Sequence, residues 1–270
     1  MNPTVGVVGA GRMGLPLIGH LARKGFRTFA TDLDASKRGK VEERGAGWTD
    51  HAAALAAQCE VVLVCVGYDH ELRGLLQDPK VASAMRQGAI YAVLSTVHPK
   101  TVQALAAECL KKNIHVVDAT MCRGGKAADE GTLLSFVGGE AAVVERLRPV
   151  LGAFSRDVVH TGGVGSAQVA KAVNNLIMWA CLVANHEGLA LAQRYGIDVD
   201  KLRQALVVSS AANNALANWG TQTMAWAEDD MAIVSEMAAD CGLALPQAGV
   251  TRELCRILKP KRYKLEEYGR

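Results

Sequence analysis

The chain has 270 residues and a formal net charge of +3; half of its residues are hydrophobic and 21% are charged. This balance is typical of a folded globular protein and excludes a disordered one. Lysines and arginines gather only at residues 259–267, where acidic residues accompany them, so nucleic-acid binding is not expected.

The seven cysteines are scattered, odd in number and without a C-x-x-C pair, which favours a reducing compartment and argues against a structural zinc site. Residues 4–9 already resemble a strand with glycines, unlike the basic start and apolar stretch of a signal peptide. The longest apolar run, LIMWACLVA, is far shorter than a membrane span. We therefore expect a cytoplasmic protein with no metal, no membrane contact and no nucleic-acid partner.

The first half of the chain alternates short β-branched runs with helical patterns. The runs that predict strands are residues 4–9, 27–32, 60–67, 89–96, 115–120 and 157–163, and the helical patterns include one that ends at Lys24, residues 35–44 and residues 100–112. Such alternation indicates βαβ units and a parallel sheet. After residue 163 every pattern is helical, with breaks at residues 195–200, 213–220 and 242–246. A boundary near residues 160–163 is therefore expected, and a helix from Gly165 to about Tyr195 is long enough to cross between two domains.

A glycine-rich loop follows the first strand. Gly9, Gly11 and Gly14 form the pattern G-x-G-x-x-G between a strand and a helix. The first glycine permits a tight turn, the second lets the backbone approach a pyrophosphate, and the third allows close packing of helix and strand. The residues expected to contact a dinucleotide here are Gly9, Ala10, Gly11, Arg12, Met13 and Gly14.

Asp32 closes the second strand, where a carboxylate accepts hydrogen bonds from a ribose 2′-hydroxyl and repels a 2′-phosphate. NAD is therefore the expected cofactor. The nearby Lys37 and Arg38 keep NADP as the weaker alternative, and Asp32 could instead serve only as a loop cap. FAD-binding folds share the glycine loop, so the loop indicates a dinucleotide and not a reaction.

The predicted helix that begins near Gly165 is apolar nearly all the way round, yet it carries Lys171, Asn174 and Asn175. These three side chains stand three and four positions apart, so the amine and at least one amide share a face. An unpaired ammonium buried there costs several kcal/mol. Lys171 is either a functional amine or a lysine that reaches solvent beside two structural amides.

Four motifs occur in order: the glycine loop, LSTVHP at residues 94–99, DATMCRGGKAADEGTL at residues 118–133, and GVGSAQVAKAVNN at residues 163–175. In these motifs the chain resembles the β-hydroxyacid dehydrogenases, the family of 3-hydroxyisobutyrate dehydrogenase and tartronate semialdehyde reductase, over almost its whole length. The resemblance implies an α/β fold with an N-terminal Rossmann dinucleotide-binding domain (residues 1–162), a long interdomain helix and an all-helical C-terminal domain (residues 163–270). It also implies a homodimer or homotetramer.

The resemblance places the family's catalytic lysine on Lys171 and its substrate-orienting asparagine on Asn175, and Asn174 is expected to serve helix packing. An amine in an apolar cleft can accept or donate an alcohol proton near neutral pH. By the same resemblance, Ser95 contacts the substrate, and Thr96, Val66 and Gly67 contact the cofactor. Ser95 and Thr96 could equally cap the helix that starts at Pro99.

The chain departs from the family at the text DAPVSGG, which here is DATMCRG, so that Cys122 replaces a serine and Arg123 a glycine. The serine hydroxyl and the glycine amides ordinarily receive the substrate carboxylate. A guanidinium offers a rigid fork for a carboxylate, sulfonate or phosphate, as in the similar sulfolactaldehyde reductases. We expect Cys122, Arg123 and Gly124 to bind an acidic substrate; alternatively, Arg123 points to solvent or to Asp129.

A second departure is the text AEDDMAIV, which puts Asp229 where the family has a lysine that closes over the cofactor, followed by Asp230. Asn213, Asn214 and Trp219 are candidates for the far wall of the substrate pocket, although a helix break explains the asparagines and core packing explains the tryptophan equally well.

The function that these motifs predict is an NAD-dependent oxidoreductase that interconverts a small anionic β-hydroxy acid and its semialdehyde or keto form. The alternatives are an enzyme similar to the imine reductases, or a non-catalytic dinucleotide-binding scaffold. Relatives of both kinds usually lack the lysine, so Lys171 and Asn175 argue against them.

Overall fold

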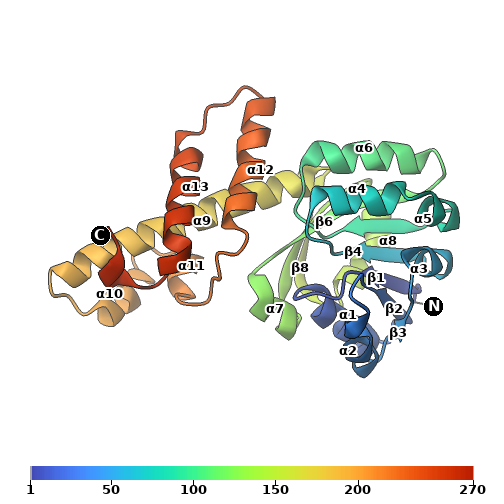
Figure 1. The fold of residues 1–270 in the computed structure, drawn as a ribbon, viewed down its shortest axis with the longest axis horizontal. Coiled ribbons are helices and arrows are strands. Elements are labelled where there is room, and N and C mark those ends of the chain that lie inside the picture. The colour runs from blue at the N-terminus through green and yellow to red at the C-terminus, as the bar shows by residue number, and fades with distance from the viewer. Residues whose placement is uncertain (1, 270) are drawn as a thin grey trace. The chain divides into compact units, whose positions relative to one another are not determined.

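The structure is a computed structural model that describes residues 2–269. Contacts divide the chain into two units, the first ending at Lys171 and the second beginning at Ala172. Unit 1 is an eight-stranded sheet covered by helices, and unit 2 is helical throughout (Figure 1). This is the α/β fold with a helical C-terminal part that the sequence predicts.

The sheet of unit 1 has the strand order β3-β2-β1-β4-β5-β6-β7-β8. Its strands are β1 (Val5–Val8), β2 (Thr28–Thr31), β3 (Gly47–Trp48), β4 (Val61–Val64), β5 (Ile90–Val93), β6 (His115–Cys122), β7 (Leu133–Gly138) and β8 (Ser155–Gly162). Neighbouring strands are parallel except β6 and β7, which pair antiparallel. The prediction of a parallel sheet is thus confirmed for β2, β1, β4, β5 and β6. It missed β3 and β7, and it did not include the opposite direction of β7 and β8.

Helices cover both faces of this sheet (Figure 1). They are α1 (Gly14–Arg23), α2 (Arg38–Glu43), α3 (Ala52–Gln58), α4 (Asp69–Gln77), α5 (Pro79–Ala84), α6 (Pro99–Leu110), α7 (Gly124–Glu130) and α8 (Ala141–Leu151), with the 3₁₀ turn η1 (Ala35–Lys37) before α2. The central strands are apolar at every position because both of their faces are buried, as is typical of parallel sheets.

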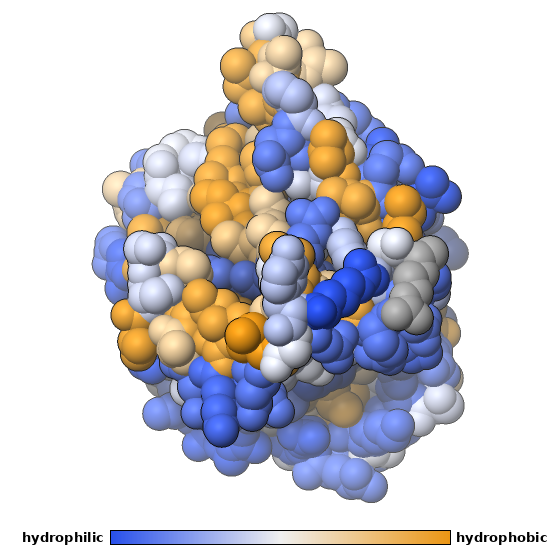
Figure 2. Space-filling model, turned by 90° about the vertical axis from the view of Figure 1, so that its left-hand side faces the viewer, coloured by the Kyte–Doolittle hydropathy of each residue, from blue (hydrophilic) through white to orange (hydrophobic). Residues whose placement is uncertain are grey.

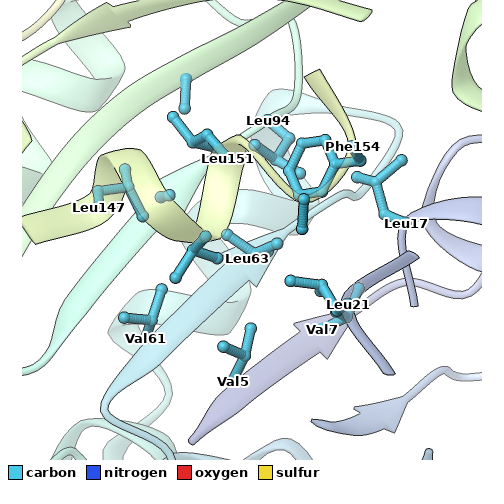
Figure 3. Packing of buried hydrophobic residues seen from close by; sticks show 14 of the residues in the cluster. Val5, Val7, Leu17, Leu21, Val61, Leu63, Leu94, Leu147, Leu151 and Phe154 are labelled. Carbon is cyan, nitrogen blue, oxygen red and sulfur yellow. The ribbon is translucent and has the colours of Figure 1, made fainter. Parts of the chain in front are cut away.

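Successive strand residues point to opposite faces, so each strand contributes to two cores. On one face, Leu17 and Leu21 of α1 and Leu147 and Leu151 of α8 pack with Leu63 of β4 (Figure 3). The other face joins alternate residues of the same strands to α3, α4 and α6; its members include Val62, Val64, Leu55, Leu72 and Leu105. Residues beyond the carboxyl ends of these strands are therefore held by a packed framework.

Unit 2 is built around α9 (Ser166–Arg194), whose first turns belong to unit 1. Its other elements are α10 (Val199–Leu206), α11 (Asn214–Ala217), α12 (Ala227–Asp240), α13 (Pro246–Leu258) and the 3₁₀ turns η2 (Lys259–Lys261) and η3 (Leu265–Glu267). Trp179, Leu182, Met231, Val234 and Cys255 form much of its core. The predicted helix from Gly165 to about Tyr195 is confirmed to within a residue at each end.

By length and composition alone, α9 could cross a membrane, and 39% of its most apolar stretch is buried. Its buried side carries polar groups with partners inside the unit: His186 is fully buried, accepts the N–H of Tyr263 through Nε2 (2.9 Å) and bonds the carbonyl of Leu182 through Nδ1 (2.8 Å). This pattern is that of a core helix.

Candidate functional site

The order of the strands reverses between β1 and β4, and parallel sheets bind ligands beyond the carboxyl ends of the strands at such a point. The loop that follows β1 contains Gly9, the loop after β4 contains Val66 and Gly67, and the loop after β5 contains Ser95 and Thr96. The predicted cofactor residues therefore lie on adjacent loops at one edge of the sheet.

The three glycines of the first loop have different surroundings. Gly9 has a φ of 98°, and a Cβ there would overlap the carbonyl oxygen of Cys65; a Cβ at Gly14 would overlap that of Gly9. Both positions thus require glycine for packing. A Cβ at Gly11 would meet nothing within 4 Å, so no atom of the protein fills the space beside it. At the start of α1, the N–H of Leu15 donates to the carbonyl of Gly11 (3.1 Å) and Pro16 has no N–H. The N-terminus of a helix after such a loop is where a pyrophosphate binds.

Asp32 lies just after β2 and is tied to this loop. Its Oδ2 accepts the N–H of Ala10 (2.7 Å) and a proton of the Lys37 amine (2.9 Å), and its Oδ1 accepts the N–H of Asp34 (3.0 Å). Burial alone would raise the pKa of Asp32, but the hydrogen bonds from Asp34, Lys37 and Ala10 outweigh it and lower the pKa. The carboxylate is therefore ionised at neutral pH and already paired with one amine.

Arg12 connects the glycine loop to α7. Its guanidinium forms two hydrogen bonds with the Asp129 carboxylate, at 2.9 and 2.7 Å, although both side chains are more than half exposed. Nε2 of His20, on α1, lies 3.0 Å from the carbonyl oxygen of Ala128 and 3.1 Å from that of Asp129. The side chain of Arg12 thus bridges the dinucleotide loop and the helix that follows Arg123.

Ser95 holds two of the loops together. Its Oγ donates to the carbonyl of Val66 (2.8 Å) and accepts the N–H of the same residue (3.0 Å), and only 6% of Ser95 is exposed. The N–H of Gly67 donates to Oε2 of Glu71 at the start of α4 (2.7 Å). The structure therefore gives the Ser95 hydroxyl and the Gly67 amide partners within the protein, while Thr96 is half-buried beside them.

Arg123 has an unusual backbone conformation for a residue with a side chain. Its φ is 83° and that of Gly124 is 72°, so two successive left-handed residues lead from β6 into α7. Outside glycine, this conformation costs about 1–2 kcal/mol and tends to mark functional positions. Cys122, which ends β6, is 5% exposed.

The guanidinium of Arg123 points to the neighbouring strands β7 and β8. Its Nη1 donates to the carbonyls of Thr132 (3.0 Å) and Leu133 (3.4 Å) and lies 2.6 Å from Oδ2 of Asp157. Arg123 thus pairs with Asp157, whereas Asp129, the partner weighed from the sequence, pairs with Arg12. These contacts all involve Nη1.

The start of α9 is fastened to the sheet by buried polar groups. Asp118 of β6, fully buried, accepts the N–H of Gly165 (2.7 Å) and of Gln168 (2.9 Å), and Thr120 donates to the carbonyl of Ala167 (3.0 Å). The side chain of Gln168 bonds the loop after β5. Sequence reasoning missed Asp118 and Gln168, although a glutamine one turn before Lys171 in an apolar helix was a visible signal.

Lys171 is half-buried, and Asn175, one turn later, is 2% exposed and accepts a hydrogen bond from Nδ2 of Asn174 (3.1 Å). Positions four apart on a helix lie on one side of it. One further turn on, Nε1 of Trp179 donates to Oδ2 of Asp230 on α12 (2.9 Å), and Asp229 is exposed. Asn174, Asn175 and Trp179 therefore have hydrogen-bond partners within unit 2.

The other candidates in unit 2 have structural contacts. Asn213 caps α11 by accepting the N–H of Leu216 (2.9 Å) and exchanges hydrogen bonds with Asn185. Trp219 packs on His186, with ring centroids 4.4 Å apart. Residues 2–269 contain no group of three or more His, Cys, Asp or Glu side chains that could hold a metal ion.

Comparisons with known proteins show the family of the chain. Residues 4–163 match the sequence model described as the NAD binding domain of 6-phosphogluconate dehydrogenase, and residues 165–267 match the one described as NAD-binding of NADP-dependent 3-hydroxyisobutyrate dehydrogenase. The chain is 31% identical to the 3-hydroxyisobutyrate dehydrogenase of Pseudomonas aeruginosa (90% of this chain, 85% of the relative) and 28% identical to the NAD-dependent L-serine dehydrogenase of the same organism (89% and 83%).

Among solved structures, the 3-hydroxyisobutyrate dehydrogenase of Mycobacterium tuberculosis, with L-serine, superposes with a TM-score of 0.87 at 21% identity, over 96% of this chain and 94% of that one. At this identity the likeness concerns the fold. The two sequence models together span nearly the whole chain and describe NAD-binding domains. The chain thus belongs to the β-hydroxyacid dehydrogenase family and is an NAD(P)-binding oxidoreductase that acts on the CH–OH group of a hydroxy acid.

Proposed function

We propose that this dehydrogenase uses NAD to interconvert a small β-hydroxy acid, bearing a carboxylate or sulfonate, and its semialdehyde or keto form. The observation that carries the proposal is the position of Lys171. It lies one turn beyond the segment of α9 that hydrogen-bonds to β6 and to the loop after β5, at the same edge of the sheet as the glycine loop.

When bound, the nicotinamide supplies the hydride acceptor for oxidation and the hydride donor for reduction. In oxidation, the Lys171 amine takes the hydroxyl proton as the hydride leaves the carbon, and in reduction it returns a proton to the oxygen. Asn175, four residues later on the same side of α9, donates its amide to the substrate oxygen or fixes the amine.

Arg123 is the proposed anion-binding residue. Its Nη1 is held by two carbonyls and Asp157, which fixes the plane of the guanidinium and leaves Nε and Nη2 for a substrate anion. Gly124 supplies the adjoining backbone, and Cys122 and Ser95 complete this side of the proposed substrate site.

Arg123→Ala should raise KM for the anionic substrate at least tenfold and leave KM for NAD unchanged, since a charge-assisted hydrogen bond contributes about 1.5–3 kcal/mol. An unchanged substrate KM would remove Arg123 from the proposed site.

NAD is the proposed cofactor because the ionised Asp32 carboxylate lies where the adenosine ribose is expected, and one relative is named for its dependence on NAD. NADP is the weaker alternative, since Lys37 partly neutralises the same carboxylate.

We also propose a homodimer or homotetramer. Ten of the fifteen large hydrophobic residues that are exposed within residues 2–269 belong to unit 2: Val173, Ile177, Leu191, Tyr195, Ile197, Val208, Trp226, Leu243, Val250 and Ile257. Figure 2 shows apolar side chains gathered in patches on one face of the molecule. Contiguous exposed apolar surface is a mark of interfaces. No disulfide bond joins any of the cysteines within residues 2–269, which supports a cytoplasmic location. The proposed domain boundary lies between residues 162 and 163, close to residues 163–165, where the first sequence model ends and the second begins.

The first experiment is to measure NADH formation from NAD with a panel of 3-hydroxy carboxylates and hydroxysulfonates. Lys171→Met should lower kcat by about 10²–10⁴-fold, the usual contribution of general acid–base catalysis, while NAD binding stays within about twofold. Lys126→Met is the matched control, because Lys126 is an exposed lysine on α7.

Turnover by Lys171→Met close to that of the parent protein would contradict the proposed role. If the parent protein oxidises no substrate of the panel although NAD raises its melting temperature, the non-catalytic scaffold becomes the better explanation.

A further inference from the structure

The Gln168 side chain joins α9 to the loop after β5. It is 1% exposed, its Oε1 accepts the N–H of Val97 (3.0 Å), and its Nε2 donates to the carbonyl of Ser95 (2.9 Å). The amide therefore pairs with the loop backbone as a neighbouring strand would. Both partners are backbone groups, so the side chain fixes the course of the loop and not merely one side chain on it.

The loop that Gln168 holds is itself bound to the next loop. The Ser95 hydroxyl bonds both backbone groups of Val66, beyond β4. A continuous series of hydrogen bonds thus runs from the loop after β4, through the loop after β5, to α9. Lys171 follows Gln168 by three positions and lies on the same side of the helix, one turn away.

The other contacts at the start of α9 are of a different kind. Asp118 and Thr120 bind backbone groups of residues 165–168, so they fix the end of the helix against β6. Gln168 instead relates the helix to the loop that carries Thr96. A shift of that loop relative to α9 would alter the distance between Lys171 and whatever is bound beside Ser95 and Thr96.

We propose that Gln168 is a positioning residue that sets the separation between the Lys171 amine and the reacting end of the site beside Ser95 and Thr96. This inference rests on the proposed function, because it requires Lys171 to exchange the substrate proton. Gln168 acts through the loop and the helix and does not itself contact the substrate.

Two variants test the proposal. Gln168→Met keeps the size of the side chain and removes both hydrogen bonds. Its kcat, expressed per NADH-binding site, should be about 10- to 100-fold lower than that of the parent protein, because displacements of about 1 Å have effects of that order. KM for NAD should change less than twofold. Gln103→Met is the matched control, since Gln103 donates to the carbonyl of Val164, just before α9, and does not hold the loop after β5.

Gln168→Glu provides a readout that a purely structural role would not give. A protonated carboxyl can accept from Val97 and donate to Ser95, as the amide does, whereas an ionised one faces the Ser95 carbonyl without a proton. The ratio of its kcat to that of the parent protein should therefore rise as the pH is lowered, and the ratio for Gln168→Met should stay constant.

The proposal is overturned if Gln168→Met has a lower melting temperature but an unchanged kcat per NADH-binding site. It is also overturned if the Gln168→Glu ratio does not vary with pH, and this arm decides the matter if Gln168→Met does not fold. Failure of the proposed function is distinguishable, because Lys171→Met would then turn over normally whatever the behaviour of the Gln168 variants.

Discussion

Asp32 and Lys37 form an ion pair beside the glycine loop. The 2.9 Å ion pair uses an oxygen that also accepts the N–H of Ala10, so a ribose hydroxyl and a 2′-phosphate would meet a carboxylate and an amine side by side. An isolated aspartate would exclude NADP more strongly than this pair does.

Lys37→Met should therefore sharpen the preference for NAD. We expect the ratio of kcat/KM for NAD to that for NADP to rise about three- to tenfold, mainly through KM for NADP, because a partly exposed ion pair contributes roughly 1 kcal/mol. Steady-state kinetics with both cofactors checks this, with the exposed Lys40→Met as the control. An unchanged ratio would mean that the Lys37 amine is not near the bound 2′ position.

The residue types of this site could be identified from the sequence, but their partners could not. Gly9, Gly11 and Gly14 follow from a local pattern, and the structure gives Gly9 and Gly14 a steric reason. Arg123 was visible as an anomaly, yet its contact with Asp157 depends on the pairing of β7 with β8, which no local pattern contains. Gln168 was missed for the same reason, since its partners lie on a loop distant in sequence.

At the scale of elements, α9 carries a buried histidine that makes unit 2 sensitive to acid. His186 accepts the N–H of Tyr263 on Nε2, so its proton lies on Nδ1, toward Leu182. Burial lowers the pKa of His186, despite the opposing hydrogen bond to Leu182. Folding therefore favours the neutral form of His186. The stability that this group contributes to the folded protein is fully present above its unfolded pKa of about 6.5, and it is lost as the pH falls through the lower pKa of the folded state.

The melting temperature of the protein should accordingly fall as the pH is lowered below about 6.5. His186→Gln should be less stable at pH 8, because it loses the ring contacts with Trp219 and Tyr263, and its melting temperature should depend less on pH over the acidic range. Thermal denaturation at a series of pH values checks both, and the exposed His51→Gln serves as the control. Parallel pH curves for the parent protein and His186→Gln would contradict this assignment.

The strands differ in how far the sequence could predict them. β1, β2, β4 and β5 are β-branched, apolar runs that alternate with helices, and all were predicted. β3 has only two residues, too few for any pattern. β7 was missed because it lies within a motif that was interpreted for its function. Its direction could have been inferred, because parallel strands need a crossover of about a dozen residues or more and the connection between Cys122 and Leu133 is shorter.

At the scale of the whole molecule, the proposed assembly follows from surface that a monomer leaves in water. Val169, Val173 and Ile177 recur every four residues on α9, and each is 43–58% exposed. This spacing produces one apolar stripe along the helix, and covering it with a second copy would remove that surface from solvent.

The protein should therefore sediment as a dimer or tetramer, and Ile177→Glu should shift it toward the monomer, because a charge in an apolar interface must be desolvated. Leu110→Glu is the control, since Leu110 is equally exposed but lies in unit 1. Sedimentation velocity over a range of concentrations distinguishes the forms. If the parent protein is a monomer, the proposed assembly is wrong. If Ile177→Glu has the same oligomeric mass as the parent protein, this stripe is not part of the interface.

The place of Lys171 along α9 has a consequence for how precisely the amine is held. Hydrogen bonds to Asp118, Thr120 and Gln168 fix the first turn of the helix against the sheet and the loop after β5. Lys171 follows Gln168 by three residues, about 4.5 Å along the helix axis at 1.5 Å per residue. An error in the direction of the axis grows with distance from the fixed turn, so an error of about 10° displaces the backbone of Lys171 by only about 1 Å. A residue farther along α9 would lose that precision.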